Sequence, residues 1–205
     1  IVGFDIDLAN AVAEKLGLKL ELKPVDWSTV TLTLNKGDID VIWNGFSVSE
    51  KRKKEVDFSD SYLDNKQIMV VKNDSDMVGK KDLKDKILGI QAGSTSEGAL
   101  AKEADVESSL KEIKKYADNV QALMDLGIGR VDVVLVDEVV GRYYVAKKPG
   151  EYKILEEDFG KEEYAIGIKK GNDKLREKIN EALAELREDG TESKISEKWF
   201  GEDII

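Results

Sequence analysis

The sequence predicts an α/β protein with two related lobes, each a mostly parallel sheet flanked by helices. Stretches with strand and helix character alternate along the 205 residues, an order that produces parallel sheets with right-handed crossovers. A short sequence pattern also occurs twice, as Gly-Asp-Ile-Asp-Val at 37–41 and Gly-Arg-Val-Asp-Val at 129–133. Each copy joins the end of a helix to a buried strand with a polar tip. Short turns between helices and strands often look alike, so an ordinary repeated turn remains the alternative.

The first half of the chain starts with an amphipathic helix. Residues 5–18 have apolar side chains at helical spacing, and Gly17 is a typical C-terminal stop. Residues 19–26 alternate between polar and apolar side chains, which predicts a strand. Residues 28–40 predict a helix that ends before residues 40–43, a short buried strand.

The second half repeats this alternation. The predicted elements are a strand at 86–90 that enters a helix through the turn 91–97, a helix at 119–129, a strand and helix within 130–148, a strand at 163–171, a long helix at 173–190 and a short helix at 194–200.

Composition excludes several classes of function. The formal net charge of −10 argues against binding duplex nucleic acid, which requires a basic face, and against docking on anionic lipid. The chain has no histidine and no cysteine, which removes the commonest general base and the best zinc ligands. We expect no metal and no cofactor. No apolar run approaches the ~20 residues of a membrane-spanning helix.

The first candidate binding residues follow the strand at 40–43. The chain passes through Asn44, Gly45 and Phe46 to the hydroxyl of Ser47, and Arg52 lies a short loop beyond. An arginine presents a rigid fork of donors that matches a carboxylate. The alternative is a solvated arginine within a basic run.

The turn at 91–97 offers a second set of polar groups. Gln91 ends a strand, and Ser94 and Thr95 stand at the start of the following helix. Free N–H groups at a helix start favour an anion. The alternative is an ordinary N-cap made by one of the two hydroxyls.

Two further candidates follow strands. Asp137 comes directly after an apolar strand, where its carboxylate can pair with an ammonium group or simply cap the next helix. Trp27 follows the strand at 19–26 and can line a pocket or pack in a core. A cation, an anion, helix N–H groups and an aromatic wall together complement a zwitterionic amino acid.

Five stretches of this sequence resemble the polar amino-acid-binding proteins of ABC importers. They are GFDIDLANAVAEKLG, KGDIDVIWNGFSVSEKRKKEVDFSDSY, GIQAGSTSE, GRVDVVLVDE and REDGTESKISEKWFG. They occur in the order of that family and cover essentially the whole chain. The family normally begins with another strand, so we expect that this chain was trimmed or belongs to a longer one.

The resemblance implies a periplasmic-binding-protein-like fold with the ligand in a cleft between two lobes. Residues 1–65 and 164–205 would form the first lobe and residues 66–163 the second. Hinge crossovers would lie near 65–72 and 162–168.

The resemblance also implies roles for individual residues. Arg52, with Ser47, would bind the ligand α-carboxylate, which the Thr95 hydroxyl also contacts, and Asp137 would bind the α-ammonium. Asn44 and Gly45 would contribute backbone contacts, while Trp27 and Gln91 would line the side-chain pocket.

The function implied is that of a non-catalytic receptor. It would bind an amino acid outside the cytoplasm, in the periplasm or on a lipid anchor, close by hinge motion and deliver the ligand to a membrane permease. We expect a monomer. The alternatives are an enzyme on the same fold, such as a cyclohexadienyl-type dehydratase, and a ligand-binding sensor domain.

Overall fold

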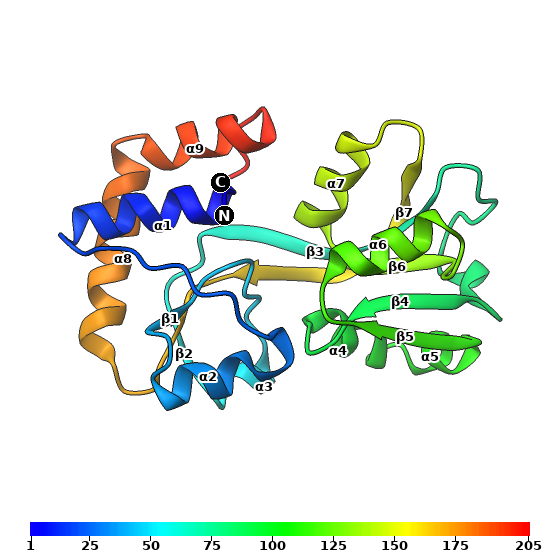
Figure 1. Cartoon of the computed structure of the whole chain (residues 1–205), viewed down its shortest axis with the longest axis horizontal. Coiled ribbons are helices and arrows are strands. Elements are labelled where there is room, and N and C mark those ends of the chain that lie inside the picture. The colour runs from blue at the N-terminus through cyan, green and yellow to red at the C-terminus, as the bar shows by residue number, and fades with distance from the viewer. The chain divides into compact units, whose positions relative to one another are not determined.

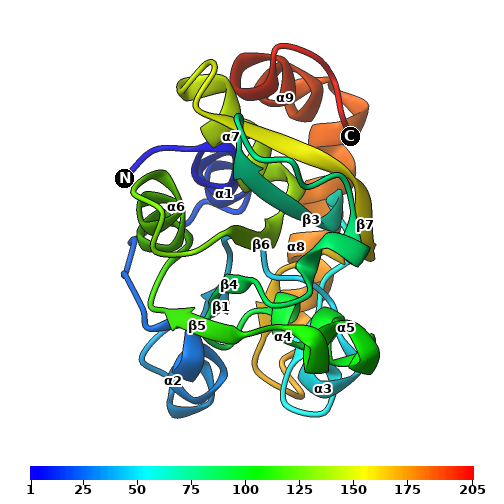
Figure 2. The ribbon, with the colours of Figure 1, turned by 90° about the vertical axis from the view of Figure 1, so that its right-hand side faces the viewer.

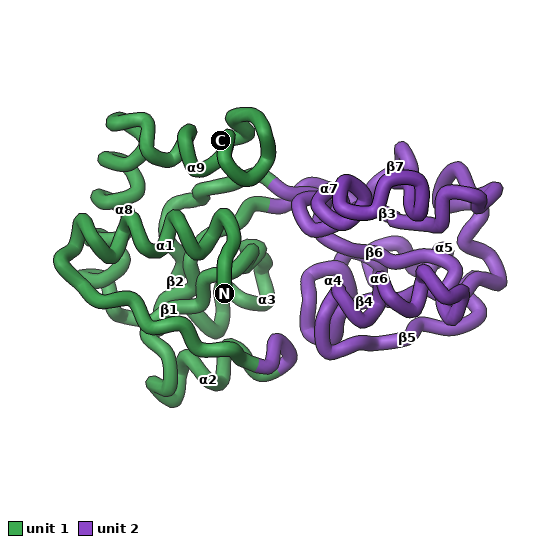
Figure 3. The backbone as a smooth tube through the Cα atoms, turned by 45° about the horizontal axis from the view of Figure 1, so that its top comes forward, with its two compact units in different colours: residues 1–25, 29–64, 163–205 green, residues 26–28, 65–162 purple.

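Helices and strands alternate along the whole chain, so the predicted α/β class is confirmed. The structure is a computed structural model that describes all of residues 1–205. The chain divides into two compact units (Figure 3). Unit 1 comprises Ile1–Val25, Thr29–Asp64 and Glu163–Ile205, and unit 2 comprises Asp26–Ser28 and Asn65–Glu162.

Unit 1 combines three packed helices with a small sheet (Figure 1). Helix α1 contacts both α8 and α9, which also contact each other. The predicted helix at 5–18 is confirmed as α1, and its apolar stripe buries Leu8 and Val12. The elements of unit 1 are α1 (Phe4–Lys15), α2 (Val30–Lys36), β1 (Val41–Ile42), α3 (Glu50–Lys53), β2 (Asp57–Phe58), β8 (Gly167–Ile168), α8 (Asp173–Glu188) and α9 (Thr191–Phe200).

The sheet of unit 1 is antiparallel, and the expectation of a mostly parallel sheet is wrong there. Its strand order is β1-β8-β2, and β8 runs antiparallel to both neighbours. The reason lies in the chain path. The central strand β8 belongs to the returning part of the chain, and it enters the sheet in the direction opposite to β1 and β2.

The strand predicted at 19–26 is also absent. These residues form no regular element and are mostly exposed, and Leu22 exposes 38% of its surface. The alternation of apolar and polar side chains is compatible with a strand. A strand nevertheless requires a neighbour that supplies ladder hydrogen bonds, and no strand pairs with this segment.

Unit 2 contains a five-stranded sheet with the order β5-β4-β6-β3-β7. Strands β5, β4 and β6 are parallel, and β3 runs antiparallel to β6. The elements are β3 (Leu63–Lys72), η2 (Lys80–Leu83), β4 (Ile87–Gln91), α4 (Thr95–Ala101), α5 (Ala104–Ser109), β5 (Glu112–Tyr116), α6 (Asn119–Gly127), β6 (Val133–Asp137), α7 (Glu138–Lys147) and β7 (Tyr152–Tyr164). The turn η1 (Trp27–Thr29) begins among the residues grouped with this unit.

Helices cover both faces of the unit 2 sheet (Figure 2). Along β3, Met69 packs on the side of α4 and α5, whereas Ile68 and Val70 pack on the side of α6 and α7. This follows from the strand period of two, which sends successive side chains to opposite faces. The carboxyl ends of β4 and β6 carry Gln91 and Asp137, which are partly exposed. In open α/β sheets, ligands bind at such ends.

Gly167 of β8 allows the tip after β1 to pack closely on the unit 1 sheet. A Cβ atom at this position would lie 2.8 Å from Phe46 Cε1 and 3.2 Å from Ile42 Cβ. Phe46 is fully buried, so its ring has little freedom to move away. We expect Gly167→Ala to lower the free energy of unfolding by about 1–3 kcal/mol through overpacking, measured from the urea midpoint at constant slope.

Gly98 provides a matched control. It lies within helix α4, and a Cβ there would meet nothing within 4 Å. Gly98→Ala should leave the stability unchanged or raise it by up to about 1 kcal/mol, since alanine favours the helix. Equal midpoints for Gly167→Ala and the unmodified protein would refute the packing argument.

Candidate functional site

The chain forms a tight tip directly after β1, in unit 1. Gly45 has a left-handed backbone with φ of +59°, and a Cβ there would lie 3.1 Å from the Tyr164 ring. Its N–H donates a hydrogen bond of 2.8 Å to Asp5 Oδ2. Asn44 beside it is exposed. Only glycine fits this position without strain, which explains the glycine in the predicted polar tip.

Arg52 is not a solvated surface arginine. It is 7% exposed, and its Nη1 donates a hydrogen bond of 2.8 Å to the Ser47 carbonyl. Its guanidinium carbon lies 4.2 Å from the centroid of the Phe46 ring. Helix α3 positions this side chain, because the Ser49 hydroxyl accepts a 3.2 Å hydrogen bond from the Arg52 N–H as its N-cap. The guanidinium is therefore held in a fixed orientation.

Phe46 and Ser47 are buried beside this arginine. Phe46 also stacks on Phe58 with ring centroids 5.4 Å apart, and Ser47 pairs with Tyr164 through an antiparallel bridge. The bridge connects the tip to the returning part of the chain.

Asp5 is a residue that the sequence analysis missed. Its Oδ1 has no contact with solvent, although the residue as a whole is only half-buried. Burial raises the pKa of this carboxyl to about 6, against the opposing effects of the nearby Tyr62 hydroxyl and of the hydrogen bond from the Gly45 N–H. An acidic residue in the first turn of a helix is usually explained by the helix dipole. The sequence therefore did not indicate that Asp5 accepts a hydrogen bond from the tip after β1.

In unit 2, the turn after β4 presents Gln91, Ser94 and Thr95. Ser94 occupies the N-cap position of α4, but its side chain makes no cap and instead donates a 2.8 Å hydrogen bond to the Gln91 carbonyl. The Gln91 side chain is bound to the loop after β5, where its Nε2 donates to the Ala117 carbonyl at 3.2 Å. The N-cap alternative for Ser94 is therefore wrong.

Thr95 points toward the last strand of the unit. Its hydroxyl donates a hydrogen bond of 2.9 Å to Glu162 Oε2. The N-cap alternative fails for this residue too, because Thr95 is the first residue of α4 and its hydroxyl bonds to β7.

Asp137 stands at the N-cap position of α7, but its side chain does not cap that helix. Its Oδ1 accepts hydrogen bonds from Asn65 Nδ2 at 2.6 Å and from Gln67 Nε2 at 2.7 Å. Asn65 Oδ1 accepts the Glu138 N–H at 3.1 Å and so caps the helix in place of Asp137. The carboxylate of Asp137 is thus oriented by two buried amides of β3.

Trp27 is half-buried in η1 and does not belong to the buried core. The next residue, Ser28, lies against the turn after β4, since a Cβ on Gly93 would come within 2.7 Å of Ser28 Cα. Gly93 also has a left-handed φ of +75°. This close approach is consistent with the grouping of residues 26–28 with unit 2.

The structure brings the predicted residues together in two sets, one in each unit. The unit 1 set contains Asn44, Gly45, Phe46, Ser47 and Arg52. The unit 2 set contains Trp27, Gln91, Ser94, Thr95 and Asp137.

Glu162 is the second residue that the sequence analysis missed, and it belongs with the unit 2 set. Its carboxylate receives the Thr95 hydroxyl and the Gln67 amide. Its position in a charged stretch of the sequence, EEDFGKEEY, resembles a solvated strand edge and does not distinguish it from its neighbours.

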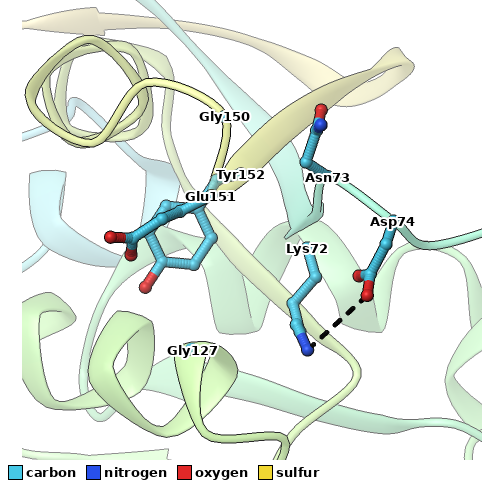
Figure 4. A pocket seen from close by; sticks show the side chains of 7 residues that line it. All are labelled: Lys72, Asn73, Asp74, Gly127, Gly150, Glu151 and Tyr152. Carbon is cyan, nitrogen blue, oxygen red and sulfur yellow. Dashed lines mark ion pairs between the residues drawn. The ribbon is translucent and has the colours of Figure 1, made fainter.

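A pocket of about 320 Å³ lies elsewhere in unit 2 (Figure 4). It is found at the C-terminal end of β3, and an ion pair of 3.9 Å between Lys72 and Asp74 borders it. It is lined by Lys72, Asn73, Asp74, Gly127, Gly150, Glu151 and Tyr152. None of the predicted binding residues contributes to it.

Known proteins resemble this chain over its whole length. A family model described as bacterial extracellular solute-binding proteins, family 3, matches residues 1–202. The L-cystine-binding protein TcyJ of Escherichia coli (strain K12) is 34% identical over 206 residues, covering 100% of this chain and 76% of that protein.

Solved structures agree. A substrate-binding protein of an ABC uptake transporter from Streptococcus pneumoniae, with bound histidine, has a TM-score of 0.95 and 39% identity and covers 99% of this chain and 85% of that one. An ancestral arginine-binding protein bound to arginine has a TM-score of 0.91 and 46% identity, with 98% and 88% covered. Every helix of this chain is too short or too polar to span a bilayer. The chain belongs to the bacterial extracellular solute-binding proteins of family 3.

Proposed function

We propose that this protein captures an α-amino acid outside the cytoplasm and delivers it to the membrane permease of an ABC importer. Family membership supports the solute-binding role. The observation that carries the amino-acid assignment is the buried Arg52, whose guanidinium is oriented by a carbonyl and a ring. An oriented guanidinium matches a carboxylate with two parallel hydrogen bonds.

The two charged ends of the ligand have separate partners in this proposal. Arg52 and the Thr95 hydroxyl take the α-carboxylate, and Asp137 takes the α-ammonium. Backbone groups at Asn44 and Gly45 add contacts, and Gln91 and Trp27 face the ligand side chain. Relatives are named for cystine, histidine and arginine, so the side chain is the variable part of recognition.

The mechanism follows from a division of the chain into two lobes, 1–65 with 164–205 and 66–163. Segments near 65–72 and 162–168 act as hinges, and ligand binding shifts the protein toward a closed form that the permease recognises. The protein acts as a monomer in the periplasm or on a lipid anchor at the cell surface.

A thermal-shift panel of the twenty amino acids, each at millimolar concentration, tests the function. A ligand at about 100 times its dissociation constant stabilises the native state by about 2.7 kcal/mol, a shift of several degrees. We expect a selective shift for one chemical class, and no shift for the α-carboxamide of the best ligand, which lacks the carboxylate.

Two outcomes would count against the proposal. A flat panel from a cooperatively melting protein would contradict amino-acid binding. Turnover of prephenate or arogenate would instead favour the enzyme alternative, in which a carboxylic acid acts as general acid.

A further inference from the structure

The carboxylate of Glu162 is fixed beside the ligand-binding groups of unit 2. Glu162 lies near the end of β7 and is half-buried. Its Oε2 accepts hydrogen bonds from the Thr95 hydroxyl at 2.9 Å, from Gln67 Nε2 at 3.0 Å and from Asn65 Nδ2 at 3.4 Å. Three donors on two elements therefore define the position of this oxygen.

Hydrogen bonds at both ends of its amide fix the orientation of the Gln67 side chain. Its Oε1 accepts the Ser96 hydroxyl at 2.5 Å, which leaves Nε2 as the group that faces the carboxylates. That nitrogen lies between Asp137 Oδ1 at 2.7 Å and Glu162 Oε2 at 3.0 Å. Gln67 is fully buried and belongs to β3, which lies between the strands β6 and β7 that carry the two acids.

The Thr95 hydroxyl has a single proton, and it donates this proton in a hydrogen bond to Glu162. A threonine hydroxyl donates one hydrogen bond at a time, although its oxygen can accept others. In the proposed function, the same hydroxyl donates to the α-carboxylate of the ligand. The ligand carboxylate and Glu162 thus compete for the same hydrogen-bond donor, and two carboxylates next to one donor repel each other.

We propose that Glu162 sets the affinity of this receptor, as an internal carboxylate that competes with the ligand carboxylate for Thr95. The inference rests on the proposed function of Thr95. On binding, the Thr95 hydroxyl must redirect its hydrogen bond from Glu162 to the ligand carboxylate, and two negative charges come close together. Both effects weaken binding, and they favour release of the amino acid to the next component of the transport system.

Glu162 could instead attract the ligand ammonium together with Asp137, and this alternative predicts the opposite sign. Removing the negative charge would then weaken binding, because the ammonium would lose a partner. The direction of the change in affinity therefore separates competition from attraction.

The experiment is isothermal titration of the full chain with L-arginine, L-histidine, L-glutamine and L-cystine. We compare the unmodified protein with Glu162→Gln, which removes the charge, and with Glu162→Asp, whose shorter side chain moves the charge away from Thr95. The matched control is Glu163→Gln, because Glu163 is the next residue and is exposed.

Competition predicts that Glu162→Gln binds the same amino acids roughly tenfold more tightly, that Glu162→Asp changes in the same direction, and that Glu163→Gln is unchanged. Unchanged or weaker binding by a folded Glu162→Gln and Glu162→Asp would overturn the inference, while leaving the receptor function intact. If the unmodified protein binds none of the four amino acids and none in the wider panel, the proposed function itself fails.

Discussion

Replacing Arg52 with alanine is expected to weaken amino-acid binding by roughly 30-fold or more. Truncating one partner of a desolvated charge pair costs about 2–5 kcal/mol, and Arg52 is both buried and held in position by Ser47 and Phe46. Arg52→Lys keeps the charge without the planar fork, so its affinity should fall between those of the unmodified and alanine forms. Titration calorimetry with the best ligand measures both.

The control for this prediction is Arg176→Ala in helix α8 of the same unit. Arg176 pairs with Asp173 at 2.7 Å on the surface, so its removal should change neither affinity nor stability by much. Thermal melts are needed for Arg52→Ala, because it also loses the contact with the Phe46 ring. A folded Arg52→Ala protein with unchanged affinity would exclude Arg52 as the carboxylate partner.

Asp5 is expected to make the stability of the fold fall between about pH 4 and pH 6. Burial raises its pKa from 3.8 to about 6 in the folded state, so the folded state holds a proton that the unfolded chain has released in this range. The stabilisation is fully present below pH 3.8 and is lost as pH rises through about 6. The difference between the pKa values of 3.8 and about 6 corresponds to about 3 kcal/mol.

The comparison of Asp5→Asn with the unmodified protein isolates this contribution. Asparagine has nearly the same shape and its Oδ1 can still accept the Gly45 N–H, but it does not titrate. Its stability relative to the unmodified protein should therefore rise by about 3 kcal/mol from pH 4 to pH 7, measured by urea unfolding at each pH.

Other acids change the profile of both proteins alike and cancel in this difference. Burial also raises the pKa of Glu192, whereas hydrogen bonds from Thr191 and Lys15 lower the pKa of Asp189 to about 2. Asp40→Asn, at an exposed position before β1, is the control. Parallel pH profiles for Asp5→Asn and the unmodified protein would show that Asp5 titrates normally.

Long helices were the most predictable part of this fold. Helix α8 (Asp173–Glu188) was predicted at 173–190 because its apolar side chains recur at helical spacing over four turns, and Asn172 caps its start through a 3.4 Å hydrogen bond from the Leu175 N–H. Local pattern and local hydrogen bonding agree there, so no distant contact was needed.

Elements that depend on distant partners were less predictable. The edge strand β5 (Glu112–Tyr116) was not predicted, because its charged sequence suits an exposed edge and shows no apolar alternation. Residues 19–26 show the reverse case, since they have the alternation but no partner strand. Which strands pair is decided by the folded chain, and the pattern of apolar and polar residues along the sequence indicates it only in part.

The candidate binding residues could be proposed from their places at strand ends. The neighbouring side chains that orient them could not be predicted from the sequence. Asp137 was recognised because it follows an apolar strand. Its orientation depends on Asn65 and Gln67, which precede it by about seventy residues and become neighbours only through the pairing of β3 with β6. Asp5 and Glu162 were missed for the same reason, since each acts on a group distant in the sequence.

The discontinuous course of unit 1 determines the order in which the molecule can form during synthesis. Helix α1 is synthesised long before α8 and α9, on which it packs, and its ion pairs Lys15–Glu185 and Asp7–Lys198 join residues far apart in the sequence. Residues 65–162 of unit 2, by contrast, are continuous. Unit 2 can thus complete its sheet before α1 has its partners, and the apolar face of α1 remains open to chaperones or aggregation until α8 and α9 have been synthesised.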